Sequence, residues 1–243
     1  MAFLELSNVN FSAQDRVLVK NFSYQYEEGK TTALVGPSGD GKSTVLKLSA
    51  GLLVPNKGEV SFRGKNIAHM NHKENLEFRR EAAVVFQDSA LWANQNLFEI
   101  LELPLRIHFP RMTRKEREER IDQVLKAVGY RKELGFRPSQ LSMGEQKLIA
   151  FARAIICRPG LLFLDEWTES LDDSAAQRLV RLVRRHQEEG HTVIFVSHDP
   201  RLIRSLADHV LMIMGGELYA KLTRDQIESD EDIARYLEQG ITA

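Results

Sequence analysis

The sequence predicts an α/β fold built on a mainly parallel sheet, with an antiparallel β subdomain and a helical subdomain. The first observation is a set of short, almost entirely apolar runs, which are typical of strands buried on both faces of a sheet. They span residues 31–35, 83–86, 161–164 and 192–196. The second observation is that several of these runs precede a helix-like stretch, and such alternation favours a parallel sheet covered by helices.

Antiparallel strands are expected in two other parts of the chain. The first 30 residues and the stretch from Asp208 to Ala220 are rich in strand-forming residues. Each contains a turn signal, at residues 27–29 and 215–216 respectively. We therefore expect both stretches to form an antiparallel annex beside the main sheet.

The helical subdomain is expected between about Asn94 and Gln140, where the composition shifts toward helix-forming residues. Thr113 and Glu116 have the spacing of a capping box at the start of a charge-dense helix. Its interleaved acidic and basic residues predict a solvated helix face rather than a nucleic-acid patch. Residues 223–240 predict one or two amphipathic acidic helices.

Composition excludes several classes of protein. The 243 residues carry 33 Lys and Arg against 34 Asp and Glu, a net charge of −1, so we expect no nucleic-acid partner. Cys157 is the single cysteine, which excludes a disulfide framework and favours a reducing compartment. The N-terminus lacks the pattern of a signal peptide, and no apolar run approaches the roughly 18 residues of a membrane span. We expect a cytoplasmic chain whose membrane role, if it has one, depends on another chain.

A phosphate-binding loop is the strongest motif. Residues 36–43 read Gly-Pro-Ser-Gly-Asp-Gly-Lys-Ser and match G-x-x-x-x-G-K-[ST] between a strand and a helix predicted from Lys42 to about Gly51. Backbone N–H groups of such a loop, with the helix N-terminus, bind phosphate oxygens. Lys42 is expected to reach the β- and γ-phosphates, and Ser43 to bind Mg²⁺. The expected nucleotide-binding residues here are Gly36, Pro37, Ser38, Gly39, Asp40, Gly41, Lys42, Ser43 and Thr44.

Two carboxylates end one of the apolar strands. Asp165 follows the run 161–164 at the carboxyl edge of the sheet, where ligands gather in open α/β folds, and is expected to bind Mg²⁺. Glu166 is expected to polarise an attacking water. Gln87 and His198 follow two other strands. We expect Gln87 to join the Mg²⁺ shell and His198 to contact the γ-phosphate or the water.

These motifs in this order resemble the ATP-binding cassette family of transporter ATPases, and the resemblance covers essentially the whole chain. In chain order they are the loop at 36–43, Gln87, residues 141–146 (Leu-Ser-Met-Gly-Glu-Gln), Asp165 with Glu166, residues 170–172 (Ser-Leu-Asp) and His198. The resemblance implies a P-loop ATPase core and a single cassette over residues 1–243. Its implied parts are a core with the β annex at 1–87 and 141–220, a helical subdomain at 88–140 and a helical tail at 221–243.

The resemblance also implies a head-to-tail homodimer that binds and hydrolyses two Mg-ATP between its subunits. Ser142, Gly144 and Glu145 would contact the nucleotide of the other subunit, and Asp172 would lie on the dimer seam. The family's adenine-stacking aromatic falls near Ala13, which cannot stack, so Phe11 is the expected substitute.

Three further departures concern loops of the site. Met143 occupies a position that is usually Gly, Trp167 one that is usually Pro, and Glu169 one that is usually small. Because Lys42, Asp165, Glu166 and His198 are retained, an active ATPase is favoured over a degenerate regulatory cassette, although Met143 leaves that alternative open.

The region after Gln87 looks most like the cassettes of bacterial phospholipid-trafficking (Mla-type, MCE-associated) systems and, less closely, those of amino-acid importers. In the family this region grips a helix of an integral membrane permease, here at a groove near Gln87, Leu91, Trp92, Leu97 and Phe98, on the cytoplasmic face of the inner membrane. A lipid-binding subunit is a further implied partner. The alternatives are a soluble ATP-switched cassette without a transporter, an importer of small solutes and a simple nucleotide kinase.

Overall fold

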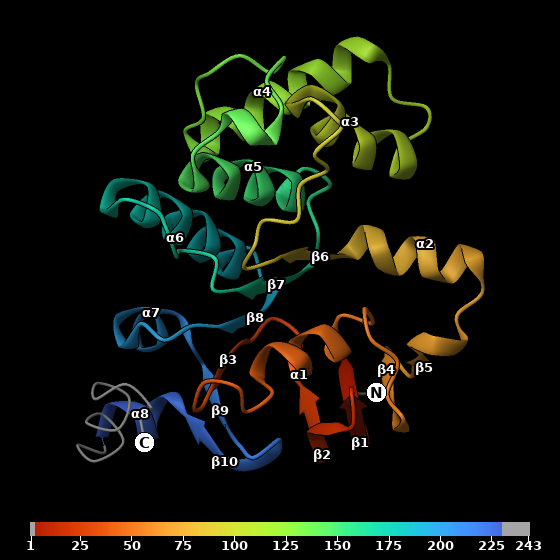
Figure 1. Cartoon of the computed structure of the whole chain (residues 1–243), viewed down its shortest axis with the longest axis vertical. Coiled ribbons are helices and arrows are strands. Elements are labelled where there is room, and N and C mark those ends of the chain that lie inside the picture. The colour runs from red at the N-terminus through yellow and green to blue at the C-terminus, as the bar shows by residue number, and fades with distance from the viewer. Residues whose placement is uncertain (1–2, 230–243) are drawn as a thin grey trace. The chain divides into compact units, whose positions relative to one another are not determined.

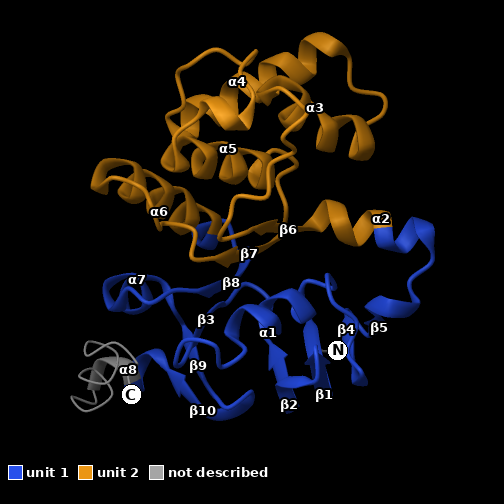
Figure 2. Ribbon diagram, viewed as in Figure 1, with its two compact units in different colours: residues 1–75, 187–243 blue, residues 76–186 orange. Residues whose placement is uncertain are grey.

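The computed structural model describes residues 3–229 (Figure 1). Figure 2 shows two compact units: the first holds residues up to 75 and from 187 onward, and the second holds residues 76–186. Most of the predicted C-terminal helical stretch, residues 230–240, lies outside the described residues, and its described part is helix α8 (Arg224–Ser229).

The antiparallel sheet of the first unit has the strand order β2-β1-β4-β5. Its strands are β1 (Leu4–Ala13), β2 (Arg16–Tyr26), β4 (Lys57–Phe62) and β5 (Lys65–Asn66). Leu4 lies opposite Tyr26 of β2 and Phe62 of β4, and all three side chains are buried. This confirms the antiparallel strands predicted in the first 30 residues, whereas β4 and β5 were not predicted.

The second sheet of this unit is built around β3 (Thr31–Val35), which pairs in parallel with β8 (Thr192–Val196) and with β9 (His209–Met214). Every residue of β3 and β8 is buried, as the apolar runs predicted. Strand β10 (Glu217–Thr223) pairs with β9 in the antiparallel direction.

Residues 208–220 form antiparallel strands around the predicted turn, but their predicted place in an annex beside the main sheet is wrong. Strand β9 extends the parallel sheet beside β3, and only β10 is antiparallel. The reason is visible in the burial of β9, since Val210, Leu211 and Ile213 are all fully buried, which is the behaviour of a strand covered on both faces.

The helices of the first unit follow its strands closely. They are α1 (Lys42–Ser49), the 3₁₀ helix η1 (Ile67–His69), α2 (His72–Glu81), which contains the boundary at residue 75, α7 (Pro200–Leu206) and α8. Helix α1 packs on β3 and buries Val45, Leu46 and Leu48. The P-loop motif therefore lies between a buried strand and a buried helix, as predicted.

The second unit contains a parallel pair, β6 (Ala82–Val85) and β7 (Leu161–Asp165), and a group of helices. The helices are α3 (Leu97–His108), α4 (Arg114–Val128), the 3₁₀ helix η2 (Pro138–Gln140), α5 (Met143–Ile155) and α6 (Asp173–Glu188), which contains the boundary at residue 186. Figure 1 shows α3, α4 and α5 gathered together, and these three helices pack on one another.

These helices confirm the helical subdomain that the composition shift between residues 94 and 140 predicts. Helix α4 begins with the predicted capping box, in which Thr113 accepts from the Glu116 N–H and the Glu116 carboxylate accepts from the Thr113 N–H. Over residues 3–229, no helix combines the length and the hydropathy that crossing a membrane requires.

Candidate functional site

The glycines of the P-loop are required by its backbone path. Gly36, Gly39 and Gly41 all have positive φ angles, of 149°, 86° and 94°. A Cβ atom at Gly36 would overlap the carbonyl oxygen of Ile213 in β9, and one at Gly41 would overlap that of Leu18 in β2. The loop therefore lies directly against two strands of its unit, where side chains do not fit.

Lys42 is the first residue of α1 and is 6% exposed. Its Nζ donates to the carbonyl oxygens of Gly36 and Pro37, both at 2.8 Å, so the cation lies within the loop. The Asp40 carboxylate accepts from the Gly215 N–H at 2.8 Å and ties the loop to the β9–β10 turn. A buried cation, a helix N-terminus and left-handed glycines together form a site for anionic phosphate.

The remaining predicted residues of the first unit lie near the ends of β1 and β8 and in the first turn of α1. His198 is exposed and follows β8 after the buried Ser197. Phe11 is partly buried in β1 opposite Val19, and Ala13 is exposed at the end of the same strand. Ser43 and Thr44 lie in the first turn of α1 and are half-buried.

Asp165 and Glu166 lie where β7 ends, in the second unit. Asp165 is the last residue of the strand and is 2% exposed. Glu166 has a φ of 42°, so the chain turns sharply at this residue. Trp167, which replaces the usual Pro, is fully buried, and its ring centroid lies 5.8 Å from that of Phe151 in α5. The carboxylates therefore precede a tightly packed turn.

Gln87 is held by two residues of its own unit. Its Nε2 donates to Oε2 of Glu169 at 3.1 Å. The Nζ of Lys147, a residue of α5 that is 2% exposed, donates to the Gln87 carbonyl, to that of Phe86 at 3.3 Å and to that of Glu166 at 3.5 Å. Burial lowers the pKa of Lys147, and nearby carboxylates, Glu169 foremost, act in the opposite direction.

Arg153 holds the next part of the same loop. Its Nη1 donates to the Ala90 carbonyl at 2.6 Å and its Nη2 to that of Ser89 at 3.2 Å. Both loop residues have positive φ angles. The guanidinium carbon also lies 5.3 Å from the centre of the Trp92 ring, within the range of a cation–π contact. Helix α5 thus binds four carbonyls of residues 86–90 through two cations.

The Leu-Ser-Met-Gly-Glu motif forms the start of α5. Ser142 is the N-cap, and the Glu145 carboxylate accepts from its N–H at 3.0 Å. Lys132, 2.6 Å from that carboxylate, and the Ser142 N–H hold the pKa of Glu145 below its usual value. A Cβ at Gly144 would lie 2.9 Å from the Ser170 carbonyl oxygen, which explains why the smallest residue stands there.

Two other residues of these motifs have clear positions. Met143 is 71% exposed, so its side chain projects away from the packed start of α5. Asp172 precedes α6, and its Oδ1 accepts from the Ala175 N–H at 2.8 Å, which caps that helix.

A sequence model of the family described as "ABC transporter" matches residues 19–169 of the chain. This chain belongs to the ABC transporter family. The cassette is therefore an ATP-binding, ATP-hydrolysing subunit of an ABC transporter, which excludes the nucleotide-kinase interpretation.

Curated relatives of the cassette differ in what they are named for. It is 35% identical over 237 residues to the intermembrane phospholipid transport system ATP-binding protein MlaF of Haemophilus influenzae, with 95% of this chain and 87% of the relative covered. It is 34% identical to the nickel import ATP-binding protein NikE of Shigella flexneri, with 94% and 87% covered.

A solved structure confirms the predicted fold. The dimeric, post-hydrolysis structure of the ATP-binding cassette MJ0796 bound to ADP and Pi matches with a TM-score of 0.83 and 28% identity, covering 91% of this chain and 98% of that one. The α/β class with its β and helical subdomains is thus that of an ABC cassette.

The structure contradicts the predicted permease groove at one residue. The prediction that Leu97 is exposed in this groove is wrong, because its side chain is fully buried at the start of α3. Its N–H donates to the Phe136 carbonyl at 3.0 Å. Trp92 is 45% exposed, and Leu91 and Phe98 are half-buried.

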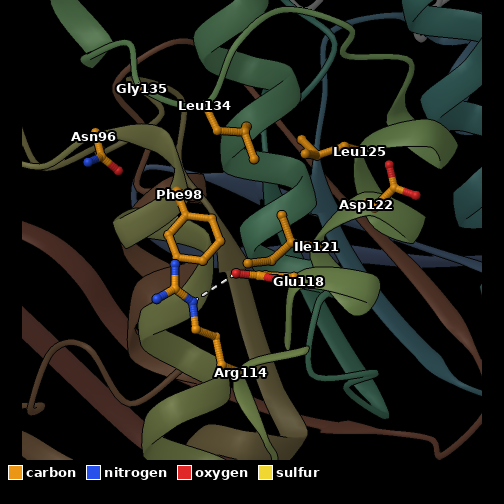
Figure 3. A pocket seen from close by; sticks show the side chains of 9 residues that line it. All are labelled: Asn96, Phe98, Arg114, Glu118, Ile121, Asp122, Leu125, Leu134 and Gly135. Carbon is orange, nitrogen blue, oxygen red and sulfur yellow. Dashed lines mark hydrogen bonds and ion pairs between the residues drawn. The ribbon is translucent and has the colours of Figure 1, made fainter. Parts of the chain in front are cut away.

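Phe98 lines a pocket of about 410 Å³ in the cassette's second unit. Figure 3 shows the Phe98 ring beside Ile121, with the ion pair of Arg114 and Glu118 at the edge. The pocket is lined by Asn96, Phe98, Arg114, Glu118, Ile121, Asp122, Leu125, Leu134 and Gly135. An apolar floor with a charged rim suits an amphipathic partner.

Sequence reasoning missed Lys147 and Arg153. Both are cations within an otherwise largely apolar helix that ends in Leu-Ile-Ala-Phe-Ala-Arg-Ala-Ile. A cation within such an apolar helix is a sequence signal for a buried hydrogen-bonding role, because a cation on a buried helix face must find acceptors. The sequence does not show that the acceptors are carbonyls of the Gln87 loop.

Proposed function

We propose that two copies of this cassette close head to tail on two Mg-ATP, hydrolyse them and reopen, and that this cycle drives a membrane permease that moves lipid. The observation that carries the nucleotide part is the P-loop, with its left-handed glycines and the buried Lys42 at the start of α1. The similarity to the MJ0796 cassette, whose solved structure is a dimer bound to ADP and Pi, supports the dimeric part.

The phosphates are assigned to the P-loop of the first unit. Its N–H groups and Lys42 bind the β- and γ-phosphate oxygens, where negative charge develops during phosphoryl transfer. We assign Phe11 to the adenine, since Ala13 offers no ring for stacking. In the dimer, Ser142 and Gly144 of the opposite subunit complete the phosphate contacts, and Glu145 caps the helix that presents them.

The metal would be held by Ser43, Gln87 and Asp165. An hydroxyl, an amide oxygen and a carboxylate are the hard oxygen donors that Mg²⁺ takes, and the buried Asp165 gives the set its negative charge. Bound Mg²⁺ would supply neutralisation of charge on the phosphate oxygens. Glu166 accepts a proton from the attacking water, and His198 orients that water.

The permease is assigned to the exposed and half-buried residues that follow Gln87. Trp92 and Phe98 offer aromatic surface in the second unit, and Leu91 lies next to Trp92. Aromatic residues at the centre of a protein interface, surrounded by a polar rim, are its usual anchors. We assign a cytoplasmic helix of the permease to this surface, which places the cassette on the cytoplasmic face of the membrane.

A first experiment purifies the tagged chain from detergent-solubilised native membranes and identifies the proteins that accompany it. A stoichiometric multi-span membrane protein is expected, and Phe98→Asp should remove it. Tyr219→Asp is the matched control, because Tyr219 is 69% exposed on β10 and has no place in the proposal. Recovery with soluble partners alone would favour the soluble ATP-switched alternative.

The substrate is tested on the same preparation. MlaF is named for phospholipid transport and NikE for nickel import, at nearly equal identity to this chain. Phospholipid and nickel are therefore measured in the purified complex, by lipid mass spectrometry and elemental analysis. Enriched phospholipid and a lipid-binding subunit support lipid transport, whereas enriched nickel without lipid supports a small-solute importer.

A further inference from the structure

We propose that Glu169 and Lys147 are positioning residues that fix Gln87 so that its side-chain oxygen, and not its nitrogen, faces the metal. The inference rests on the proposed function, in which Gln87 is a ligand of Mg²⁺. It assigns a task to two residues outside the family motifs. All three residues lie in the second unit.

The orientation of the Gln87 amide follows from its partner. A glutamine amide has a donor end and an acceptor end, whereas an ionised carboxylate only accepts. Oε2 of Glu169 lies 3.1 Å from the amide, so Nε2 of Gln87 must be the atom that faces it. Oε1 then lies on the other side of the amide. Mg²⁺ binds oxygen, so this orientation presents the correct atom.

Within residues 3–229, the hydrogen bond to Glu169 is the contact that specifies this orientation. Once that bond is lost, both faces of the amide become accessible, because the terminal torsion of glutamine is broad and roughly two-fold. An amide that samples two orientations equally offers its oxygen half of the time. The expected loss is therefore at least twofold in apparent metal affinity, and more where the wrong orientation directs N–H groups at the cation.

Lys147 fixes the backbone beneath this side chain. Its ammonium group has three donors, and three carbonyls accept from it: those of Phe86, Gln87 and Glu166. Because Lys147 is 2% exposed, removing these acceptors would leave a buried charge unsatisfied, so the arrangement is strongly enforced. One cation thereby sets the backbone of both Gln87 and Glu166.

The decisive variant is Glu169→Gln. It keeps the size of the side chain and a hydrogen bond to Gln87, but two facing amides can pair in either orientation, so the direction is no longer specified. Glu169 is exposed, so the fold is not at risk. Glu119→Gln is the matched control, since Glu119 is an exposed residue of α4 and the substitution removes the same charge.

The measurement is binding of a fluorescent ATP analogue during a Mg²⁺ titration, with binding in EDTA as the reference. Glu169→Gln should raise the Mg²⁺ concentration at half-effect by at least about twofold, because half of the amide orientations are competent, and leave affinity in EDTA unchanged. Lys147→Met should raise it as well, with Lys147→Arg restoring part of the effect; a melting curve confirms that each variant is folded.

The outcomes separate the two proposals. If Gln87→Ala raises the Mg²⁺ requirement and Glu169→Gln does not, Gln87 is a ligand but Glu169 does not orient it, and the inference is overturned. If Gln87→Ala itself has no effect, the assigned metal role fails, and the inference fails with it. A shift in both variants, absent from Glu119→Gln, supports both.

Discussion

The backbone of the P-loop allows a prediction that separates torsional strain from steric overlap. Gly39 and Gly41 have nearly equal φ angles, 86° and 94°. A Cβ at Gly39 meets nothing within 4 Å, whereas one at Gly41 overlaps the Leu18 carbonyl. Alanine at either position therefore has the same left-handed backbone to adopt, but only Gly41→Ala must also displace β2.

The magnitudes follow from these two costs. A left-handed Ala costs about 1–2 kcal/mol, which is the whole expected effect of Gly39→Ala. Overlap with backbone adds about 1–3 kcal/mol for Gly41→Ala, about 2–5 kcal/mol in total. For a chain of this size, about 2–4 °C per kcal/mol gives a Tm lower by about 2–8 °C for Gly39→Ala and by about 4–20 °C for Gly41→Ala.

Thermal unfolding followed by circular dichroism measures the difference, and binding of a fluorescent ATP analogue measures its effect on the site. Gly41→Ala should also weaken nucleotide binding more than Gly39→Ala, because Lys42 follows directly. Equal Tm values for the two variants would refute the reasoning, since the overlap with Leu18 is the only difference it invokes.

Three other outcomes are expected. Glu166→Gln should retain ATP binding and lose turnover, with the closed dimer accumulating in size-exclusion chromatography; an unchanged ATPase rate would remove Glu166 from its assigned role. Trp167→Ala should lower the stability by about 3–5 kcal/mol in urea unfolding, because a fully buried indole is lost, while Trp167→Phe keeps the contact with Phe151 and should cost far less. Burial raises the pKa of the Cys157 thiol from its ordinary value to about 11, so the thiolate fraction at pH 8 is roughly 100-fold lower in the folded protein. Its reaction with a disulfide reagent at pH 8 should therefore be much slower in the folded protein than in urea, and should accelerate as the pH rises toward that pKa; equal rates would contradict the burial.

The sequence predicted those features that depend on local pattern. The runs at Thr31–Val35 and Thr192–Val196 are strands with the predicted bounds, because nearly continuous apolar runs suit burial on both faces. The capping box of Thr113 was also predictable from local sequence, since its partner Glu116 lies three residues away.

Features that depend on distant partners were not predicted. Lys57–Phe62 begins with the exposed residues Lys-Gly-Glu, so its strand character comes from pairing with β1 rather than from its own composition. Leu97 looked like groove surface, but the packing of α3 buries it. The contacts of Lys147 and Arg153 join residues about 60 positions apart, and no local pattern reports such pairs.

The hydrogen bonds from Lys147 and Arg153 of α5 to the carbonyls of residues 86–90 have a thermodynamic consequence. Fixing the backbone of one residue removes roughly 1–2 kcal/mol of conformational entropy, so the four residues held by Lys147 and Arg153 account for roughly 4–8 kcal/mol. That entropy is lost when the chain folds, and not when a ligand arrives. A nucleotide or a permease helix that binds this loop therefore meets a preorganised surface, and its affinity is not diminished by the need to order the loop.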